Sequence, residues 1–109
     1  MVKTGAERID EDADRIIHVI VRGRVQGVGY RAWVQRQAAA HSLRGWVRNR
    51  NDGTVEAVFA GDPDSVAIIA EGLLRGPPAS QVTGVDIRTD DESALAPAFG
   101  ADFVALPTA

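Results

Sequence analysis

The chain has 109 residues, 45% of them apolar and 25% charged, and its net charge is −3. These values are typical of a single globular domain with one modest core. The chain has no cysteine, which excludes disulfides, thiolate metal sites and catalysis by a cysteine nucleophile.

Residues 1–15 form a polar and acidic N-terminal segment. They lack the apolar run of a signal peptide or membrane anchor, and no run elsewhere is long and apolar enough to span a bilayer. We therefore expect residues 1–15 to be a flexible acidic tail on a domain formed by residues 16–109. We also expect a cytoplasmic monomer without a membrane partner.

The first predicted elements are a strand over Ile16–Arg22 and a helix over Tyr30–His41. Apolar and polar residues alternate in the strand, as in one with a single buried face. The alternation assigns three residues to the core: Ile17, Val19 and Val21. Apolar residues then recur at the spacing of one helix face. The residues that fall near this face are Tyr30, Trp33, Val34, Ala38 and, at its end, the polar His41.

A hairpin is predicted next, with strands over Leu43–Arg50 and Thr54–Ala60. Between them, Asn51-Asp52-Gly53 is a strong tight-turn signal. Asp62 and Pro63 then suit the start of a second helix, which Gly76-Pro77 ends. The buried face of this helix is predicted from its apolar spacing to be Val66, Ile69, Ala70, Leu73 and Leu74.

Two more strands are predicted over Val82–Arg88 and Asp102–Leu106, joined by Thr89–Gly100 as a loop. The order is β-α-β-β-α-β with an added C-terminal strand. This order indicates an α+β, ferredoxin-like sandwich, in which two helices cover one face of a mostly antiparallel sheet.

The segment Val21–Arg31 joins the first strand to the first helix and contains three glycines, three arginines and no acid. Glycine lets backbone N–H groups turn toward one point, and a helix N-terminus adds free donors and positive potential. Arg31 opposes the helix dipole where it stands, which favours a role as an anion ligand. We therefore expect this loop to hold an anion, most simply a phosphate.

Positive charge extends beyond the loop, because residues 16–51 contain seven arginines and no Asp or Glu. Since the whole chain has a net charge of −3, the remainder carries −10. This segregation suggests local attraction for a small anion. The two histidines lie in separate elements, so we expect no metal site and no cofactor.

Two other functions fit parts of the pattern. Gly27, Gly29 and Ala32 match the G-x-G-x-x-A pattern of dinucleotide-binding proteins, although the next strand turns back through a hairpin. A ferredoxin-like RNA- or anion-binding module is the second alternative. RNA recognition would need aromatic residues on the first and third strands, where only Phe59 occurs. We therefore expect no nucleic-acid partner.

The loop and the hairpin together resemble acylphosphatases over about Ile16–Phe103. The resemblance rests on Gly23-Arg24-Val25-Gln26-Gly27-Val28-Gly29-Tyr30-Arg31 and on Gly45-Trp46-Val47-Arg48-Asn49. Asp52-Gly53-Thr54-Val55-Glu56, Gly61 and Gly76-Pro77-Pro78 extend it. One departure is His41-Ser42, where the family often has Leu-Gly. Serine adopts the left-handed conformation of a helix cap less favourably than glycine does.

The resemblance implies metal-independent hydrolysis of acyl phosphates to a carboxylate and inorganic phosphate. It implies that backbone N–H groups of the loop surround the phosphoryl oxygens, and that Arg31 binds two of these oxygens. The residues of this phosphate-binding loop are Gln26, Gly27, Val28, Gly29, Tyr30 and Arg31. Asn49 is implied to orient the attacking water, so Arg31 and Asn49 are the expected catalytic residues.

Overall fold

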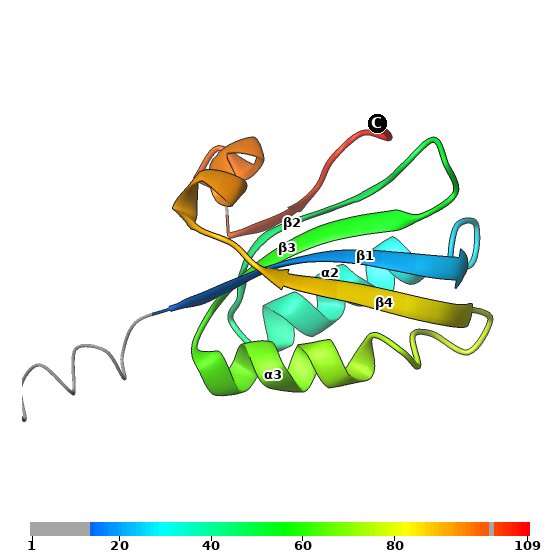
Figure 1. Cartoon of the computed structure of the whole chain (residues 1–109), viewed down its shortest axis with the longest axis horizontal. Helices are drawn as coiled ribbons and strands as arrows, with labels where there is room; N and C mark the ends of the chain where they lie inside the picture. The colour runs from blue at the N-terminus through cyan, green and yellow to red at the C-terminus, as the bar shows by residue number, and fades with distance from the viewer. Residues whose placement is uncertain (1–13, 101) are drawn as a thin grey trace, which may run out of the picture.

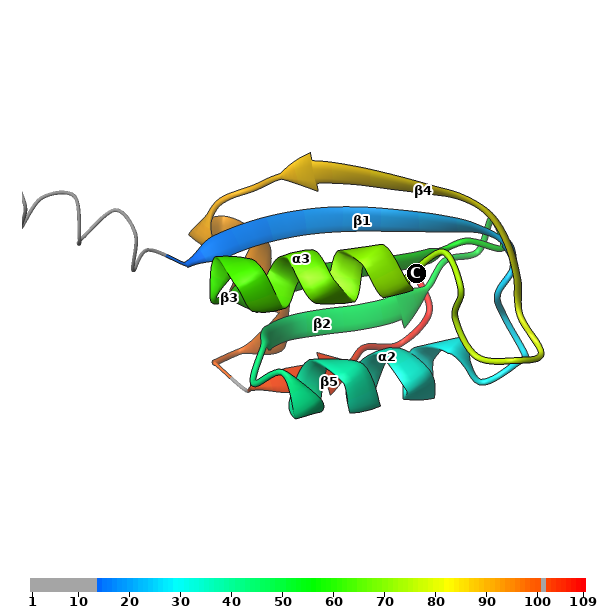
Figure 2. The ribbon, with the colours of Figure 1, turned by 90° about the horizontal axis from the view of Figure 1, so that it is seen from below.

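In the computed structural model, which describes residues 14–100 and 102–109, five strands form one mixed sheet (Figures 1 and 2). Its order is β4-β1-β3-β2-β5. The strands are β1 (Arg15–Arg24), β2 (Arg44–Asn49), β3 (Val55–Gly61), β4 (Gln81–Thr89) and β5 (Phe103–Ala105). All neighbours are antiparallel except β2 and β5, which are parallel. The expected α+β, ferredoxin-like fold is confirmed.

Helices α2 (Tyr30–Ala40) and α3 (Pro63–Gly72) lie together on one face of the sheet (Figure 2). The main core fills the space between them and the sheet. It contains the predicted strand residues Ile17, Val19 and Val21, all at most 1% exposed. Asp62 caps α3, accepting hydrogen bonds from the backbone of Asp64 and Ser65, as its sequence position predicts. The two predicted helices therefore form where their apolar spacing indicates.

The opposite face of the sheet is partly covered by a short 3-10 helix, η1 (Glu92–Ala98), visible beside the sheet in Figure 1. The prediction of a loop over Thr89–Gly100 is therefore wrong. Trp46 holds this segment against the sheet, because its indole N–H donates to the carbonyl of Ala94 at 2.7 Å. A second apolar cluster forms beneath η1, and its buried members are Ile16, Trp46, Val58, Ala60 and Ala98.

Two smaller expectations also change. Leu74 is 61% exposed because α3 ends at Gly72, so the predicted apolar face stops at Leu73. Two residues of the expected tail are described, Asp14 and Arg15, and Arg15 already belongs to β1; residues 1–13 lie outside the described residues. No helix in the described part of the chain is long and apolar enough to cross a membrane.

Candidate active site

The loop between β1 and α2 holds its two central glycines in the left-handed region. Gly27 has φ +75° and Gly29 has φ +84°. A Cβ at either position would meet no atom within 4 Å, so backbone conformation rather than space requires glycine there. Gly29 is also the N-cap of α2, where no side chain caps the helix and no acid lies in the first turn. The free N–H groups of this helix end are therefore left to bind an anion.

A cavity of about 310 Å³ opens at this helix end. Its lining comes from the loop, the first turns of α2, the end of β2 and β5. The lining residues are Val25, Gly27, Gly29, Tyr30, Arg31, Ala32, Gln35, Asn49 and Ala105. The structure therefore brings together five of the residues expected at the site, including both expected catalytic residues. Gln26 and Val28 do not line the cavity.

Asn49 is held in the cavity by its backbone on both sides of β2. It pairs with Val55 of β3, and its carbonyl accepts the N–H of Ala109 at 3.1 Å. Its side-chain Oδ1 is buried and has no hydrogen-bond partner in the described part of the chain. A buried acceptor without a partner is costly, so this atom is suited to receive a donor from a bound molecule.

Arg31 is the cation of the cavity, at the first turn of α2. No carboxylate of the described residues lies within 4.0 Å of its guanidinium. A guanidinium without a competing carboxylate can bind two oxygens of a phosphoryl group in its planar fork.

Gln26 was expected to contribute only its backbone N–H to the loop, but its side chain makes contacts of its own. Its side-chain amide donates to the carbonyls of Arg50 and Thr54, each at 2.8 Å. Those two residues face each other across the β2–β3 hairpin, where the N–H of Arg50 donates to Thr54. Gln26 thus fastens the loop to the hairpin that holds Asn49, a contact that the sequence analysis did not find.

Tyr30 begins α2 and is buried, with 1% of its surface exposed. Its hydroxyl donates to the carbonyl of Leu73 at 2.7 Å, and burial raises its pKa far above the ordinary value. The phenol therefore fixes the helix start against the end of α3 and does not titrate near neutral pH. Val28, the other loop residue absent from the cavity, packs against the main core.

The arginine-rich stretch is mostly neutralised within the fold. Glu56, on the sheet face away from the helices, accepts from His18 Nε2 and Arg48 Nε, each at 2.7 Å, and lies 3.2 Å from Arg50 Nη1. Arg22 pairs with Asp86, and Arg44 pairs with Asp14. Four of the seven arginines thus have local partners. Among the described residues, Arg24, Arg31 and Arg36 have no carboxylate partner, and of these three Arg31 lines the cavity.

The buried carboxylate of Glu56 stays ionised because of these partners. Burial by itself would raise its pKa, but hydrogen bonds from His18 and Arg48 and the charges of Arg48 and Arg50 outweigh it and hold the pKa below its ordinary value. Glu56 of β3 therefore holds Arg48 of β2, the neighbour of Asn49, on the sheet face away from the helices.

The two alternative functions meet structural obstacles. A dinucleotide-binding unit needs a strand parallel to β1, whereas both neighbours of β1 are antiparallel to it. Phe59, the aromatic residue of β3, is fully buried and stacks on Phe103 at 5.5 Å between ring centroids. It is therefore not available to stack on an RNA base. Within the described residues, no group of three His, Cys, Asp or Glu side chains could hold a metal ion.

A glycine-rich loop before an uncapped helix N-terminus, on a ferredoxin-like sandwich with arginine and asparagine in one cavity, is typical of a small phosphate-handling domain. Comparison with known proteins identifies it further: the acylphosphatase family model matches residues 17–101. The chain is 55% identical to an acylphosphatase from Bradyrhizobium diazoefficiens over 95 residues, which are 85% of this chain and 95% of that protein. The chain belongs to the acylphosphatase family, as the loop and hairpin motifs predict.

Solved structures agree. An acylphosphatase from Coxiella burnetii superposes with a TM-score of 0.75 at 37% identity, over 88% of this chain and 96% of that one. The acylphosphatase from Bacillus subtilis gives a TM-score of 0.74 at 34% identity, over 84% of this chain and 98% of that one. The expected enzyme class, a hydrolase of the acylphosphatase family, is thereby confirmed.

Proposed function

We propose that this protein hydrolyses acyl phosphates without a metal, with Arg31 and the loop binding the phosphoryl group and Asn49 orienting water. The observation that supports this assignment most directly is the shared cavity. Within the described residues, a guanidinium without a carboxylate partner, an uncapped helix N-terminus and the unpartnered Oδ1 of Asn49 all line one cavity of about 310 Å³. The first two suit a phosphoryl anion, and the third suits the O–H of a water.

In the proposed reaction, the water oxygen forms a bond to phosphorus as the bond from phosphorus to the acyl oxygen breaks. The electron pair of the broken bond leaves with the carboxylate, and a phosphoryl oxygen accepts a proton from the water. Bonding to the nucleophile is slight in the loose transition state of phosphoryl transfer, and a carboxylate is a good leaving group. No strong base is therefore needed, and the amide of Asn49 suffices to orient the water.

Charge stabilisation comes from the same residues. The guanidinium of Arg31 and the N–H groups from Gln26 to Arg31 face the oxygens on which charge accumulates, a role that a metal ion plays in many other phosphoryl-transfer sites. Positioning and electrostatic stabilisation of this kind can supply most of the acceleration.

The test is hydrolysis of benzoyl phosphate by the purified protein, with and without prior dialysis against a strong chelator. We expect turnover that the chelator does not change. Failure of the folded protein to hydrolyse benzoyl phosphate, or activity that disappears with the chelator and returns with Mg²⁺ or Zn²⁺, would contradict the proposal.

A further inference from the structure

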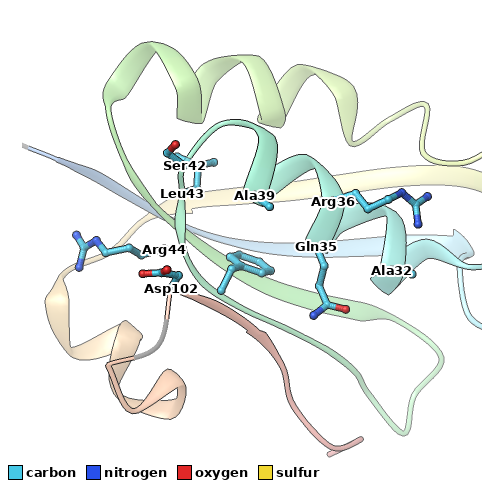
Figure 3. A pocket seen from close by; sticks show the side chains of 9 residues that line it. Ala32, Gln35, Arg36, Ala39, Ser42, Leu43, Arg44 and Asp102 are labelled. Atoms are coloured by element: carbon cyan, nitrogen blue, oxygen red, sulfur yellow. The ribbon is translucent and has the colours of Figure 1, made fainter.

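A larger hollow adjoins the cavity of Arg31 and Asn49, and the proposed chemistry does not use it. Its volume is about 730 Å³. Its lining comes from α2, the turn after it and the segment that enters β5 (Figure 3). The lining residues are Ala32, Gln35, Arg36, Ala39, Ser42, Leu43, Arg44, Asp102 and Phe103. Ala32 and Gln35 line both hollows, so the two lie side by side.

The larger hollow follows one face of α2. Ala32, Gln35 and Ala39 are spaced three and four residues apart, which places them on the same side of the helix. At 1.5 Å per residue, the path from Ala32 to Ala39 is about 10 Å long. The hollow therefore begins beside Arg31 and extends along the helix away from the phosphate-binding loop. We call it the α2–β5 groove.

Four of the nine residues that line the groove are apolar, and they come from both of its sides. Ala32 and Ala39 line it from α2, and Leu43 and Phe103 line it from the other side. The ring of Phe103 is fixed by its stack on Phe59. Gly45 also lies against this ring, since a Cβ there would come within 3.2 Å of Phe103. The groove thus has an apolar strip, with the ring of Phe103 held in place on one side.

Of the two arginines at the groove, Arg44 is paired and Arg36 points away from β5, so neither presents its charge on the β5 side. Arg44 is paired with Asp14 at 2.5 Å and lies 3.7 Å from Glu92. Figure 3 shows the side chain of Gln35 pointing from α2 toward β5, whereas that of Arg36 points away from β5. Asp102 adds a carboxylate at the far end. A ligand in the groove should therefore be uncharged along its length.

We propose that the α2–β5 groove binds the acyl part of the substrate, and that the preferred substrates are acyl phosphates with an uncharged, apolar chain longer than acetyl. This inference rests on the proposed function, because a phosphoryl group beside Arg31 places its acyl group at the mouth of the groove. Each methylene buried against Leu43 and Phe103 should raise kcat/KM about twofold to threefold. This factor is somewhat smaller than the one expected for a fully buried methylene, because the groove is open on one side.

The test compares acetyl, butyryl and hexanoyl phosphate as substrates of the wild-type protein and of two matched variants. Ala39→Phe fills the groove with an aromatic ring. Ala40→Phe places the same ring on the neighbouring residue, which is exposed and lines neither hollow. Circular dichroism and thermal melts check that the variants are folded, and Ala39→Met serves as a milder second variant.

For the wild-type protein we expect kcat/KM to rise with chain length, to about tenfold or more between acetyl and hexanoyl phosphate. Ala40→Phe should keep this preference, Ala39→Phe should remove most of it, and Ala39→Met should remove part. Hydrolysis of acetyl phosphate with no chain-length preference, or a preference that survives in Ala39→Phe, would overturn the groove assignment and leave the proposed function intact. Absence of hydrolysis of all three substrates would overturn the proposed function and the groove assignment together.

Discussion

The side-chain nitrogen of Gln26 lies 2.8 Å from the carbonyl oxygen of Arg50, the residue that follows Asn49. The same nitrogen donates to the carbonyl of Thr54 at the same distance. The loop that is proposed to bind the phosphoryl group is thus joined to the hairpin that follows Asn49. One side-chain amide makes both of these hydrogen bonds between the two halves of the site.

Replacing Gln26 by methionine should therefore disturb catalysis without unfolding the protein. Methionine keeps the length of the side chain but donates to neither carbonyl, so loop and hairpin can shift relative to each other. We expect kcat/KM for benzoyl phosphate to fall by about tenfold to a hundredfold, as for a displacement of about 1 Å in a catalytic group. The control is Gln37→Met, on α2 but outside both hollows. Unchanged kinetics in folded Gln26→Met would show that the loop keeps its place without this contact.

Ser42 occupies a left-handed conformation, with φ +56°, just after α2. The sequence suggests such a cap because the family often has glycine there, and a non-glycine residue pays about 1–2 kcal/mol for it. We expect Ser42→Gly to raise the free energy of unfolding by about 1 kcal/mol and the melting temperature by roughly 4 °C. Thermal unfolding followed by circular dichroism measures this.

The same exchange inside a helix should have the opposite sign. Ser65 lies within α3, where glycine is a poorer helix former than serine, so Ser65→Gly should lower stability by about 0.5 kcal/mol. If both variants lose stability, the left-handed strain at Ser42 does not limit the stability of the fold.

Glu56 should make the protein sensitive to acid. Its pKa is lower in the folded protein than the ordinary value of 4.5, so the unfolded chain holds more protons between the two values. The stabilisation is therefore complete above the ordinary value and is lost as the pH falls through the folded pKa. Glu56→Gln should reduce the free energy of unfolding by about 1–3 kcal/mol at neutral pH, since it leaves buried donors unsatisfied.

Urea unfolding at neutral pH and at acidic pH values progressively below 4.5 tests this assignment. The difference between wild type and Glu56→Gln should be large at neutral pH and small in acid. Glu71→Gln, an exposed site on α3, is the control and should change stability little at any of these pH values. An equal deficit of Glu56→Gln at all of these pH values would mean that ionisation of Glu56 does not stabilise the fold.

Most of the fold follows from local signals in the sequence. The alternation around Val19 and the turn residues Asn51-Asp52-Gly53 act over a few residues, and the elements form where these signals stand. The 3-10 helix η1 has one local signal, its N-cap Asp91, which accepts a hydrogen bond from the backbone N–H of Ser93. The position of η1 against the sheet comes from distant contacts, above all the hydrogen bond from Trp46 to Ala94, which local propensity does not reveal.

The candidate site shows the same division. The glycine-rich loop and the family motifs point to Arg31 and Asn49, and one cavity contains both. The partners of Gln26 and Glu56 depend on contacts between separate strands and loops. The pair of Arg48 and Glu56 is predictable from the sequence, because a hairpin turn at residues 51–53 places these two residues directly opposite each other. Opposite charges at facing strand positions are the signal that was missed.

Binding and chemistry should be separable between Asn49 and Arg31. If Asn49 only orients water, Asn49→Ala should lower kcat by roughly two orders of magnitude or more, the scale of losing one positioned catalytic contact. Inorganic phosphate should still inhibit this variant competitively with nearly unchanged affinity, because the loop and Arg31 are intact. Arg31→Ala removes the cation of the cavity and should weaken phosphate binding severely. Both variants are compared by phosphate inhibition or calorimetry once circular dichroism shows that they are folded. If Asn49→Ala loses phosphate binding as completely as Arg31→Ala does, Asn49 belongs to the anion site itself and the proposed division of roles is wrong.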